Sequence, residues 1–334
     1  MPATDPTPAS PPASTPPRSL GRWLDLAACG VLAGSLAGRA GAWHWLCDLT
    51  THFRCYWLGL ALAGLIACLR WRRPTAVALL AIAAVANTRD LLPSWLPASS
   101  LPAALASAEV ADDRRVFVIS VNVHRVNDDA TAALAYLRAR RPDVVAVLEV
   151  DDDWAAGLES LAELFPHRVI HPRTDNFGIA VLSRWPLDDV EEVAFCETGY
   201  PSIMATVRRP AGRFRFIATH PYPPFDARCT QQLLTHLDGV ADAVRTAPLP
   251  CIVAGDFNAT PWSRPFRRLV AASGLVDSAL GRGIHATWHA HLPAPRIPID
   301  HILVPAGTIV LARRVGPDIG SDHFPVEAEL LLPN

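Results

Sequence analysis

Three long apolar stretches mark the first third of the chain. They cover residues 23–38, 55–69 and 74–88, and Asp25 is the only charged residue in them. Each is shorter than the ~20 residues of a typical membrane helix, but flanking Trp and Arg side chains can extend it into the interface. We therefore predict a three-helix membrane anchor over residues 20–90. The alternatives are helices buried in a soluble core, or a signal peptide, which would leave two stretches unexplained.

The placement of arginines around these stretches predicts their orientation. Two arginines lie at the N-terminal side of the first stretch, and three lie in the second connection, between the second and third stretches. Only two lie in the first connection, between the first and second stretches. The first five are Arg18, Arg22, Arg70, Arg72 and Arg73, and the last two are Arg39 and Arg54. Positively charged connections stay on the cytoplasmic side. We expect a multi-pass protein of the inner or plasma membrane in which everything after residue 88 is extracytoplasmic.

Two segments of different composition bracket this anchor. Residues 1–19 are rich in Pro, Ala, Ser and Thr, so they predict a disordered tail with too little apolar surface to fold. Residues 91–111 contain Pro93, Pro97 and Pro102 among Ser and Ala, and they predict a linker. The remaining residues, 112–334, are expected to form the second domain.

From residue 112 onward, strand patterns and helix patterns alternate. Continuous apolar runs rich in Val and Ile predict buried strands, and a 3.6-residue periodicity predicts helices. The expected strands are 116–123, 143–150, 177–182, 203–207, 214–220, 251–254, 299–304 and 326–332, and the expected helices are 129–140, 154–164, 228–244 and 262–272. This order predicts an α/β domain whose sheets are covered on their faces.

Composition narrows the chemistry of this domain. All 30 basic residues are Arg, which excludes a Schiff-base lysine and a P-loop lysine. The seven Cys show no metal-binding spacing, and a disulfide between Cys196 and Cys229 is left open. From Asp112 onward there are 22 arginines against 27 acidic residues, a formal net charge of −5. The basic footprint of a sequence-independent nucleic-acid binder is therefore not evident.

Polar residues interrupt the apolar runs near their C-terminal ends. They are Asn122, Glu149, His220, Asp256 and Asn258. A charged side chain is rarely buried unless it is paired or bound to metal, and functional groups in α/β sheets gather beyond strand ends. A single such residue is equally well explained as a hydrogen-bonded strand end. Five in succession favour a shared site.

Two further clusters lie near the C-terminus. Asp300 stands in the sequence PIDHILV, and Asp322 and His323 stand in GSDHFPV. An oxygen-rich set with few histidines suits Mg²⁺, Mn²⁺ or Ca²⁺ and not a closed zinc site, and we favour one or two ions of Mg²⁺ or Mn²⁺. Histidine beside carboxylates suits general acid/base catalysis on a phosphoester.

The ordered motifs resemble those of the endonuclease/exonuclease/phosphatase superfamily, which includes deoxyribonucleases, inositol polyphosphate 5-phosphatases and neutral sphingomyelinases. They run from residue 116 to 332 as SVNV, a strand-ending Glu, GIAVLSR, THPYPP, GDFNATPWS, PIDHILV and GSDHFPV. With the N-terminal helices, THPYPP and GDFNATPWS resemble a membrane-anchored bacterial branch similar to teicoplanin-resistance membrane proteins. The resemblance implies a four-layer α/β sandwich, in which two mixed β-sheets are covered by helices.

The resemblance also implies metal ligands and a residue that acts on water. Glu149 matches the principal metal carboxylate of the family, and Asn122 lies beside it in the motif order. Asp322 matches a second carboxylate near the metal. Asp256 matches the aspartate that orients or deprotonates the attacking water.

The remaining implied roles concern the phosphate. Asn258 matches the asparagine that holds it, and His323 matches the phosphate-contacting histidine or general base, oriented by Asp300. His220 matches the second catalytic and substrate-contacting histidine of the nuclease and sphingomyelinase members. Four other histidines have no matched role and are expected on the surface or in packing: His171, His289, His291 and His301.

These observations predict a metal-dependent hydrolase of phosphoester bonds at the outer face of a membrane. Tethering to the bilayer raises the effective concentration of lipid head groups, so we favour a lipid-linked phosphate or phosphodiester as substrate. The alternatives are a membrane-tethered nuclease acting on DNA and a non-catalytic membrane scaffold. Loss of Glu149, Asp256 or His323 would have favoured the scaffold, and all three are present. Apart from substrate and bilayer, no protein partner is evident.

Overall fold

The computed structural model describes residues 18–96 and 114–333, and the chain divides into two compact units. One unit comprises Met1–Leu36 and Cys55–Thr88, and the other comprises Ala37–Arg54 and Arg89–Asn334. Nearly all of the expected tail and most of the expected linker lie outside the described residues.

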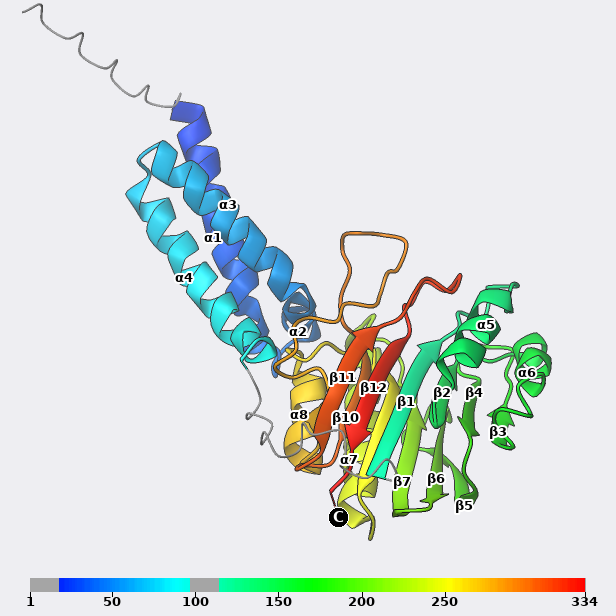
Figure 1. Cartoon of the computed structure of the whole chain (residues 1–334). Coiled ribbons are helices and arrows are strands. Elements are labelled where there is room, and N and C mark those ends of the chain that lie inside the picture. The colour runs from blue at the N-terminus through cyan, green and yellow to red at the C-terminus, as the bar shows by residue number, and fades with distance from the viewer. Residues whose placement is uncertain (1–17, 97–113, 334) are drawn as a thin grey trace, which may run out of the picture. The chain divides into compact units, whose positions relative to one another are not determined.

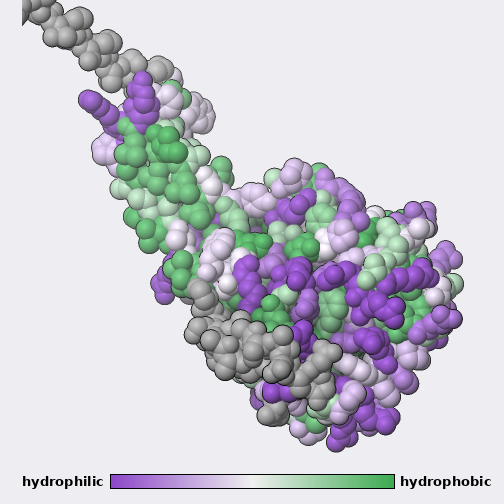
Figure 2. Space-filling model, viewed as in Figure 1, coloured by the Kyte–Doolittle hydropathy of each residue, from purple (hydrophilic) through white to green (hydrophobic). Residues whose placement is uncertain are grey.

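The first unit consists of three long apolar helices: α1 (Arg18–Ala37), α3 (Arg54–Arg70) and α4 (Pro74–Leu91) (Figure 1). The candidate membrane spans are Ser19–Ala40, Trp45–Arg70 and Pro74–Ser94. Large apolar side chains point outward from these helices, as at Ile66 (73% exposed) and Val85 (70% exposed). Figure 2 shows the same property as a largely hydrophobic visible surface on this unit. Three helices of this length and exposure indicate membrane association.

The second unit is built on two six-stranded mixed sheets, which confirms the predicted fold class. The first sheet has the order β11 (Ile309–Val315), β12 (Val326–Leu331), β1 (Arg115–Asn122), β2 (Val144–Leu148), β4 (Ile179–Ser183), β3 (His167–His171). The second has the order β5 (Leu187–Ala194), β6 (Pro201–Arg209), β7 (Gly212–Thr219), β8 (Cys251–Asp256), β10 (Asp300–Val304), β9 (Val276–Asp277). Strands β1 and β2 are parallel, as are β7 and β8, and the other neighbours are antiparallel.

Helices cover the outer face of each sheet, so the sandwich has four layers. Helices α5 (Thr131–Arg140) and α6 (Asp152–Glu159) pack against the first sheet through one buried cluster. Helices α7 (Ala227–Thr246) and α8 (Arg264–Ser273) pack against the second sheet through another. A third apolar cluster fills the space between the two sheets. Each central strand is therefore buried on both faces, which explains its continuous apolar pattern.

Every strand and helix predicted from the pattern is present, but four strands were not predicted. They are β3, β5, β9 and β11. Strand β5 is mostly exposed and rich in acidic residues, and β9 has only two residues, so neither produces an apolar run. These four strands lie at or next to sheet edges, where one or both faces meet water.

The first connection between the apolar helices belongs to the second unit. It contains the short helix α2 (Trp45–Leu49) between two 3₁₀ turns, η1 (Gly38–Ala40) and η2 (Thr50–Phe53). The carboxylate of Asp48 accepts a hydrogen bond from the backbone N–H of Arg264 at 2.8 Å, which joins this connection to the start of α8. All seven cysteines are free, and Cys196 Sγ instead lies 2.9 Å from Thr198 Oγ1.

Candidate active site

The polar strand ends of the two sheets meet at one end of the sandwich. Asn122 ends β1 and Glu149 follows β2 in the first sheet, while His220 follows β7 and Asp256 ends β8 in the second. Because each pair of strands is parallel, its carboxyl ends lie at the same edge of its sheet. Parallel pairing thus brings the polar residues at these strand ends to the same edge of each sheet.

The amide of Asn122 connects the two sheets. Its Nδ2 donates to Glu149 Oε1 at 3.0 Å and to Asp256 Oδ2 at 3.3 Å. Its Oδ1 accepts the backbone N–H of His124 at 3.0 Å. In this orientation the amide N–H groups of Asn122 hold two carboxylates in place, and its oxygen keeps a second lone pair.

Glu149 is held in an unusual backbone conformation. It has φ = 64°, in the left-handed region that non-glycine residues rarely adopt. Its second carboxylate oxygen accepts the backbone N–H of Arg125 at 3.2 Å, and the residue is 7% exposed. Strained backbone of this kind persists only where the surroundings fix it, and it is concentrated at functional sites.

Asp256 lies between two histidines. Its Oδ2 is 3.5 Å from His220 Nε2 and 3.6 Å from His323 Nε2. Its Oδ1 accepts the backbone N–H of Asn258 at 2.8 Å. Burial alone would raise the pKa of Asp256, but His323 and His220 outweigh burial and hold that pKa at about 2. Asp256 is therefore an ionised carboxylate throughout the neutral range.

His323 forms a buried pair with Asp300. His323 Nδ1 lies 2.9 Å from Asp300 Oδ2, and Thr287 Oγ1 donates to the same oxygen at 2.5 Å. Burial opposes the charged imidazolium, but Asp300 and Asp256 overcome it and raise the pKa of His323 to about 10. His220 shows the same balance: burial lowers its pKa, and Asp256 raises it above the usual value. Both histidines are thus favoured as cations.

A glycine is required beside these groups. A Cβ on Gly255 would lie 1.9 Å from the carbonyl oxygen of Thr219, a distance that no side chain allows. Gly255 precedes Asp256, and Thr219 precedes His220, so the close contact between β7 and β8 fixes both functional residues. The first position of the GDFN motif therefore requires glycine on steric grounds alone.

Two of the expected site residues sit slightly apart from this cluster. Asp322 Oδ2 accepts the indole N–H of Trp288 at 3.0 Å, and Asp322 Oδ1 lies 3.5 Å from His124 Nδ1. Asn258 Nδ2 donates to the carbonyl oxygen of Pro221 at 3.0 Å. An amide NH₂ has two hydrogens to donate, so the second remains for a ligand.

The donor set fits a divalent cation. Four carboxylates, those of Glu149, Asp256, Asp300 and Asp322, gather around two histidines, and among the described residues no arginine forms a salt bridge with them. The two histidine cations offset part of this negative charge, and a divalent cation would match the remainder. One group of mutually close ligand atoms comprises Asp256, Asp300 and His323. Within this group His323 and Asp300 already contact each other, whereas both carboxylate oxygens of Glu149 accept only N–H groups from the described residues.

Several contributors were missed by sequence reasoning. Thr287 orients Asp300, and it lies in a loop without any periodic pattern. Ser321 Oγ donates to the backbone oxygen of Asn122 at 2.7 Å and accepts the backbone N–H of His323 at 3.0 Å. Ser321 stands in the GSDH motif, so its position beside Asp322 was the available signal.

An aromatic wall, formed by Phe177, Tyr200, Tyr222 and Phe225, lies beside His220 and was also missed. The rings of Phe177 and Tyr200 stack with centroids 3.5 Å apart, and Tyr222 stacks 5.6 Å from Phe177. The Phe177 ring lies 5.2 Å from the His220 ring, and Phe225, at the outer end, is 71% exposed. Because these residues come from three separate segments, only the fold reveals the wall.

The histidines without an implied role are structural or lie near the surface. His301 is buried, with Nδ1 3.0 Å from Asp277 Oδ2 and Nε2 3.0 Å from the carbonyl oxygen of Ala259. His171 pairs with Glu192 at 2.9 Å on the surface of the edge strands. His289 and His291 are intermediate and exposed, respectively, in the loop after Thr287.

Comparisons with known proteins agree with this architecture. Residues 119–323 match the model of the Endonuclease/Exonuclease/phosphatase family. A similar solved structure is an endonuclease/exonuclease/phosphatase from Beutenbergia cavernae, with 24% identity and TM-score 0.56 over 66% of this chain and 72% of that one. Another is D. rerio TDP2 complexed with single-strand DNA product, with 20% identity and TM-score 0.54 over 65% and 98%. No curated protein sequence matches the chain. At these identities the structural likeness shows the fold.

Proposed function

The chain belongs to the endonuclease/exonuclease/phosphatase family, and from that premise we propose that it is a membrane-anchored, metal-dependent hydrolase of phosphoester bonds. Members of the family are mostly metal-dependent enzymes that hydrolyse phosphoesters. The observation that carries the proposal is the buried group around Asp256, in which two favoured cations flank one ionised carboxylate. Shifted pKa values of this kind are concentrated at catalytic sites, which favours an enzyme over a scaffold.

We assign the metal to Glu149, with Asp322 as a further oxygen donor and Asn122 as the amide that positions Glu149. A bound Mg²⁺ or Mn²⁺, as one or two ions, would supply charge stabilisation to a phosphoryl group. The remaining roles fall to side chains of the chain itself. Asp256 is ionised, so it can accept a proton from an attacking water or orient that water.

The histidines act as proton donors in this proposal. His323 carries a proton on Nε2, which faces Asp256, while Nδ1 is held by Asp300. Protonated His323 and His220 stabilise negative charge on phosphoryl oxygens and can protonate a leaving oxygen. The free hydrogen of the Asn258 amide adds a neutral donor for the same oxygens.

We favour a lipid-linked phosphate or phosphodiester as the substrate. The acidic C-terminal domain, with its net charge of −5, does not favour a polyanion such as DNA. The aromatic wall offers Tyr222 and the exposed Phe225 to an apolar group beside the phosphate. The alternative is DNA: the structure of TDP2 holds a single-strand DNA product, and stacked rings also bind bases.

The Arg asymmetry supports an extracytoplasmic domain, and the motif set supports placement in the membrane-anchored bacterial branch. The test of function is a hydrolysis panel on the full chain in lipid nanodiscs with Mg²⁺ or Mn²⁺. It compares a phosphodiester lipid, a prenyl pyrophosphate and DNA, with Asp256→Asn as the inactive control. We expect the lipid substrates to be hydrolysed faster than DNA. Faster hydrolysis of DNA would support the nuclease alternative. Equal rates for wild type and Asp256→Asn would support the non-catalytic scaffold.

A further inference from the structure

A pocket lined by arginines lies within the second unit, between the connections of the apolar helices and α8. We call it the arginine pocket; its volume is about 320 Å³, and Gly38 and Ala42 complete its wall. Its charged residues are Arg39, Arg54, Arg264, Arg267 and Asp90. None of them belongs to the catalytic group. Four cations against one anion leave positive charge that the lining itself does not neutralise.

The pocket is built by fixed contacts. Arg54 is buried and forms a salt bridge with Asp90 at 3.0 Å. The backbone of Arg264 is tied to Asp48, as described above. A Cβ on Gly38 would lie 2.2 Å from Thr51 Cγ2, so a glycine is needed for the close approach that shapes this wall. The cavity is therefore preorganised.

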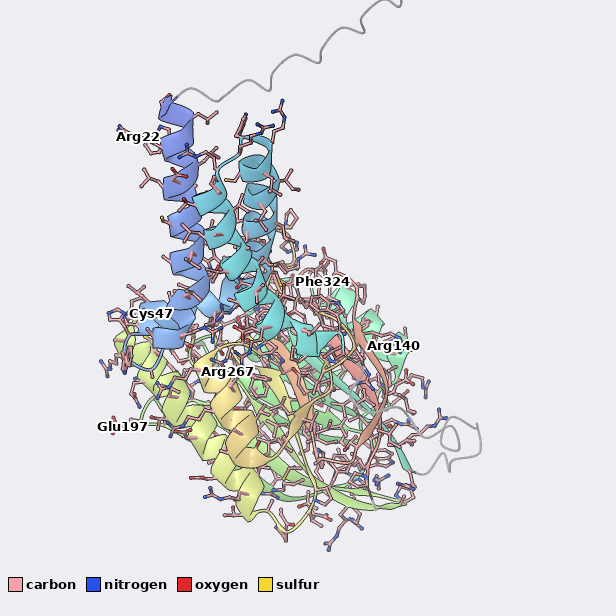
Figure 3. All side chains as sticks on the ribbon, turned by 90° about the vertical axis from the view of Figure 1, so that its left-hand side faces the viewer. Arg22, Cys47, Arg140, Glu197, Arg267 and Phe324 are labelled. Atoms are coloured by element: carbon pink, nitrogen blue, oxygen red, sulfur yellow. The ribbon has the colours of Figure 1, made fainter. Side chains whose placement is uncertain are left out.

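Two of the arginines are available to a ligand. Arg39 and Arg267 are exposed, and Figure 3 labels Arg267 on α8. Arg54 is repelled by both of these charges and attracted by Asp90 and, more weakly, by Asp48. An anion between them would relieve that repulsion. The planar guanidinium fork matches phosphate oxygens in two-point hydrogen bonds, which makes phosphate the best-fitting anion.

The chain order places the pocket residues near the ends of the three long helices. Arg39 lies two residues after the end of α1, Arg54 begins α3, and Asp90 stands in the last turn of α4. If the helices cross a bilayer, these residues lie at its boundary with water. Exposed tryptophans in the same connections, Trp43 (88% exposed) and Trp95 (53% exposed), are typical of that boundary.

An apolar cavity of about 460 Å³ adjoins the arginine pocket and shares Asp90 and Arg267 with it. Its apolar wall consists of Trp262, Phe266, Val270, Leu275, Leu280 and Ile284. Asp300 also borders it. A charged pocket continuous with an apolar one suits an amphiphile better than a free anion, since both parts of an amphiphile are then matched.

We propose that the arginine pocket and the apolar cavity together bind one anionic phospholipid, with its phosphate between Arg39 and Arg267 and an acyl chain along α8. This lipid is separate from the substrate of the catalytic site. The inference rests on the proposed membrane anchoring, but it does not depend on which phosphoester is hydrolysed.

The test measures lipid-induced thermal stabilisation of the full chain in detergent, with EDTA present so that no lipid is consumed. The probes are phosphatidylglycerol, phosphatidylcholine, deacylated glycerophosphoglycerol and inorganic phosphate. We expect stabilisation by phosphatidylglycerol, less by the deacylated head group, and none by the other two. Arg267→Gln should weaken phosphatidylglycerol binding roughly tenfold or more, since it removes a charged hydrogen bond. Arg39→Gln is the second variant if Arg267→Gln fails to fold.

Both substitutions in α8 have a matched control on the same helix. Arg268→Gln removes the neighbouring arginine, which faces Asp238 and does not line the pocket, so it should bind as wild type. Val270→Trp should fill the apolar cavity and weaken the binding of phosphatidylglycerol but not that of glycerophosphoglycerol. Ala272 does not line the cavity, so Ala272→Trp is the control and should bind both as wild type does.

Four results would overturn the inference. They are equal stabilisation by phosphatidylcholine, an equal effect of inorganic phosphate, unchanged binding in both Arg267→Gln and Arg39→Gln, and loss of binding in His323→Ala with retention in the arginine variants. The last would place the lipid in the catalytic site. Extraction of the wild-type chain from membranes by alkaline carbonate would remove the anchoring on which the inference rests.

Discussion

His323 Nδ1 lies 2.9 Å from Asp300 Oδ2, and both side chains are almost completely buried. The two residues are 23 positions apart, at the start of β10 and in the loop before β12. Asp300 fixes which nitrogen of His323 faces Asp256, so the pair acts as one unit. Thr287 Oγ1 donates a hydrogen bond to the same oxygen of Asp300 and so helps to hold the carboxylate in place.

This pairing predicts non-additive losses of activity. His323→Ala should reduce turnover by roughly 10²-fold or more, because it removes a general acid. Asp300→Asn should also lose activity, and combining both changes should cost little beyond His323→Ala, since residues that act as a unit do not add. The measurement is turnover of the three variants on one phosphoester, with circular dichroism as the folding control. Losses that multiply in the double variant would contradict the pairing.

The charge of His323 predicts an alkaline limit to activity. Its pKa is raised to about 10, so the imidazolium persists through the neutral range and is lost only as the pH rises through that value. Activity should therefore fall at alkaline pH. Asp300→Asn weakens the support for the cation, so its residual activity should fall at a lower pH than that of wild type. Rate profiles at fixed free Mg²⁺ check this, and coincident alkaline limbs would argue against a catalytic imidazolium.

The carboxylate site predicts dependence on a divalent cation. Hydrolysis should vanish with EDTA and return with Mg²⁺ or Mn²⁺, because oxygen donors suit these ions. Glu149→Gln keeps the shape of the side chain but removes its charge, so the concentration of Mg²⁺ needed for half-maximal rate should rise. Glu192→Gln, an exposed surface change, is the control. Full activity of wild type in chelator would refute the metal assignment.

The distribution of arginines predicts that the C-terminus lies outside the cytoplasm. A reporter that is active only outside the cytoplasm, fused after Leu332, should give signal, whereas a cytoplasmic reporter at the same position should not. The opposite pattern would reverse the proposed topology. A fusion after Arg72, in the second connection, should show the inverse result and so serves as the internal control.

The sequence predicted the buried parts of the fold because burial leaves continuous apolar runs in the central strands and a helical periodicity in the covering helices. Central strands such as β2 and β8 are apolar on both faces, and their polar ends, Glu149 and Asp256, stand out against that background. Edge strands such as β5 meet water, so their residues alternate weakly and gave no signal. Thr287 and Tyr222 lie in loops, and their contacts depend on long-range folding that no local pattern records.

A second histidine site, behind the catalytic group, is neutral rather than charged. His236 on α7 is fully buried, with Nε2 2.7 Å from Thr219 Oγ1 and 3.3 Å from Ser202 Oγ. Burial, and to a lesser extent the charge of His220, lower the pKa of His236 to about 3. His236 therefore stays neutral in the folded protein while it supports the strand end that carries His220.

This shift predicts acid sensitivity in a defined pH range. The unfolded chain binds a proton at His236 below about pH 6.5, whereas the folded protein does not until about pH 3, so stability is complete above pH 6.5 and declines as the pH falls. One proton gives a slope of about 1.4 kcal/mol per pH unit, or about 2 kcal/mol between pH 6.5 and 5. The contribution of His323 to stability has the opposite pH dependence. Because its pKa is raised, this contribution is fully present below pH 6.5 and is lost as the pH rises towards 10.

His236→Gln should remove this component, because an amide can still hydrogen-bond to Thr219 but does not titrate. Between pH 6.5 and 5 the apparent melting temperature of the full chain should fall by roughly 4–8 °C more in wild type than in His236→Gln, given about 2–4 °C per kcal/mol for a domain of this size. Tryptophan fluorescence in detergent provides the measurement. The exposed His291→Gln should follow wild type, so a common pH dependence in all three proteins would show that His236 is not the buried acid-sensitive group.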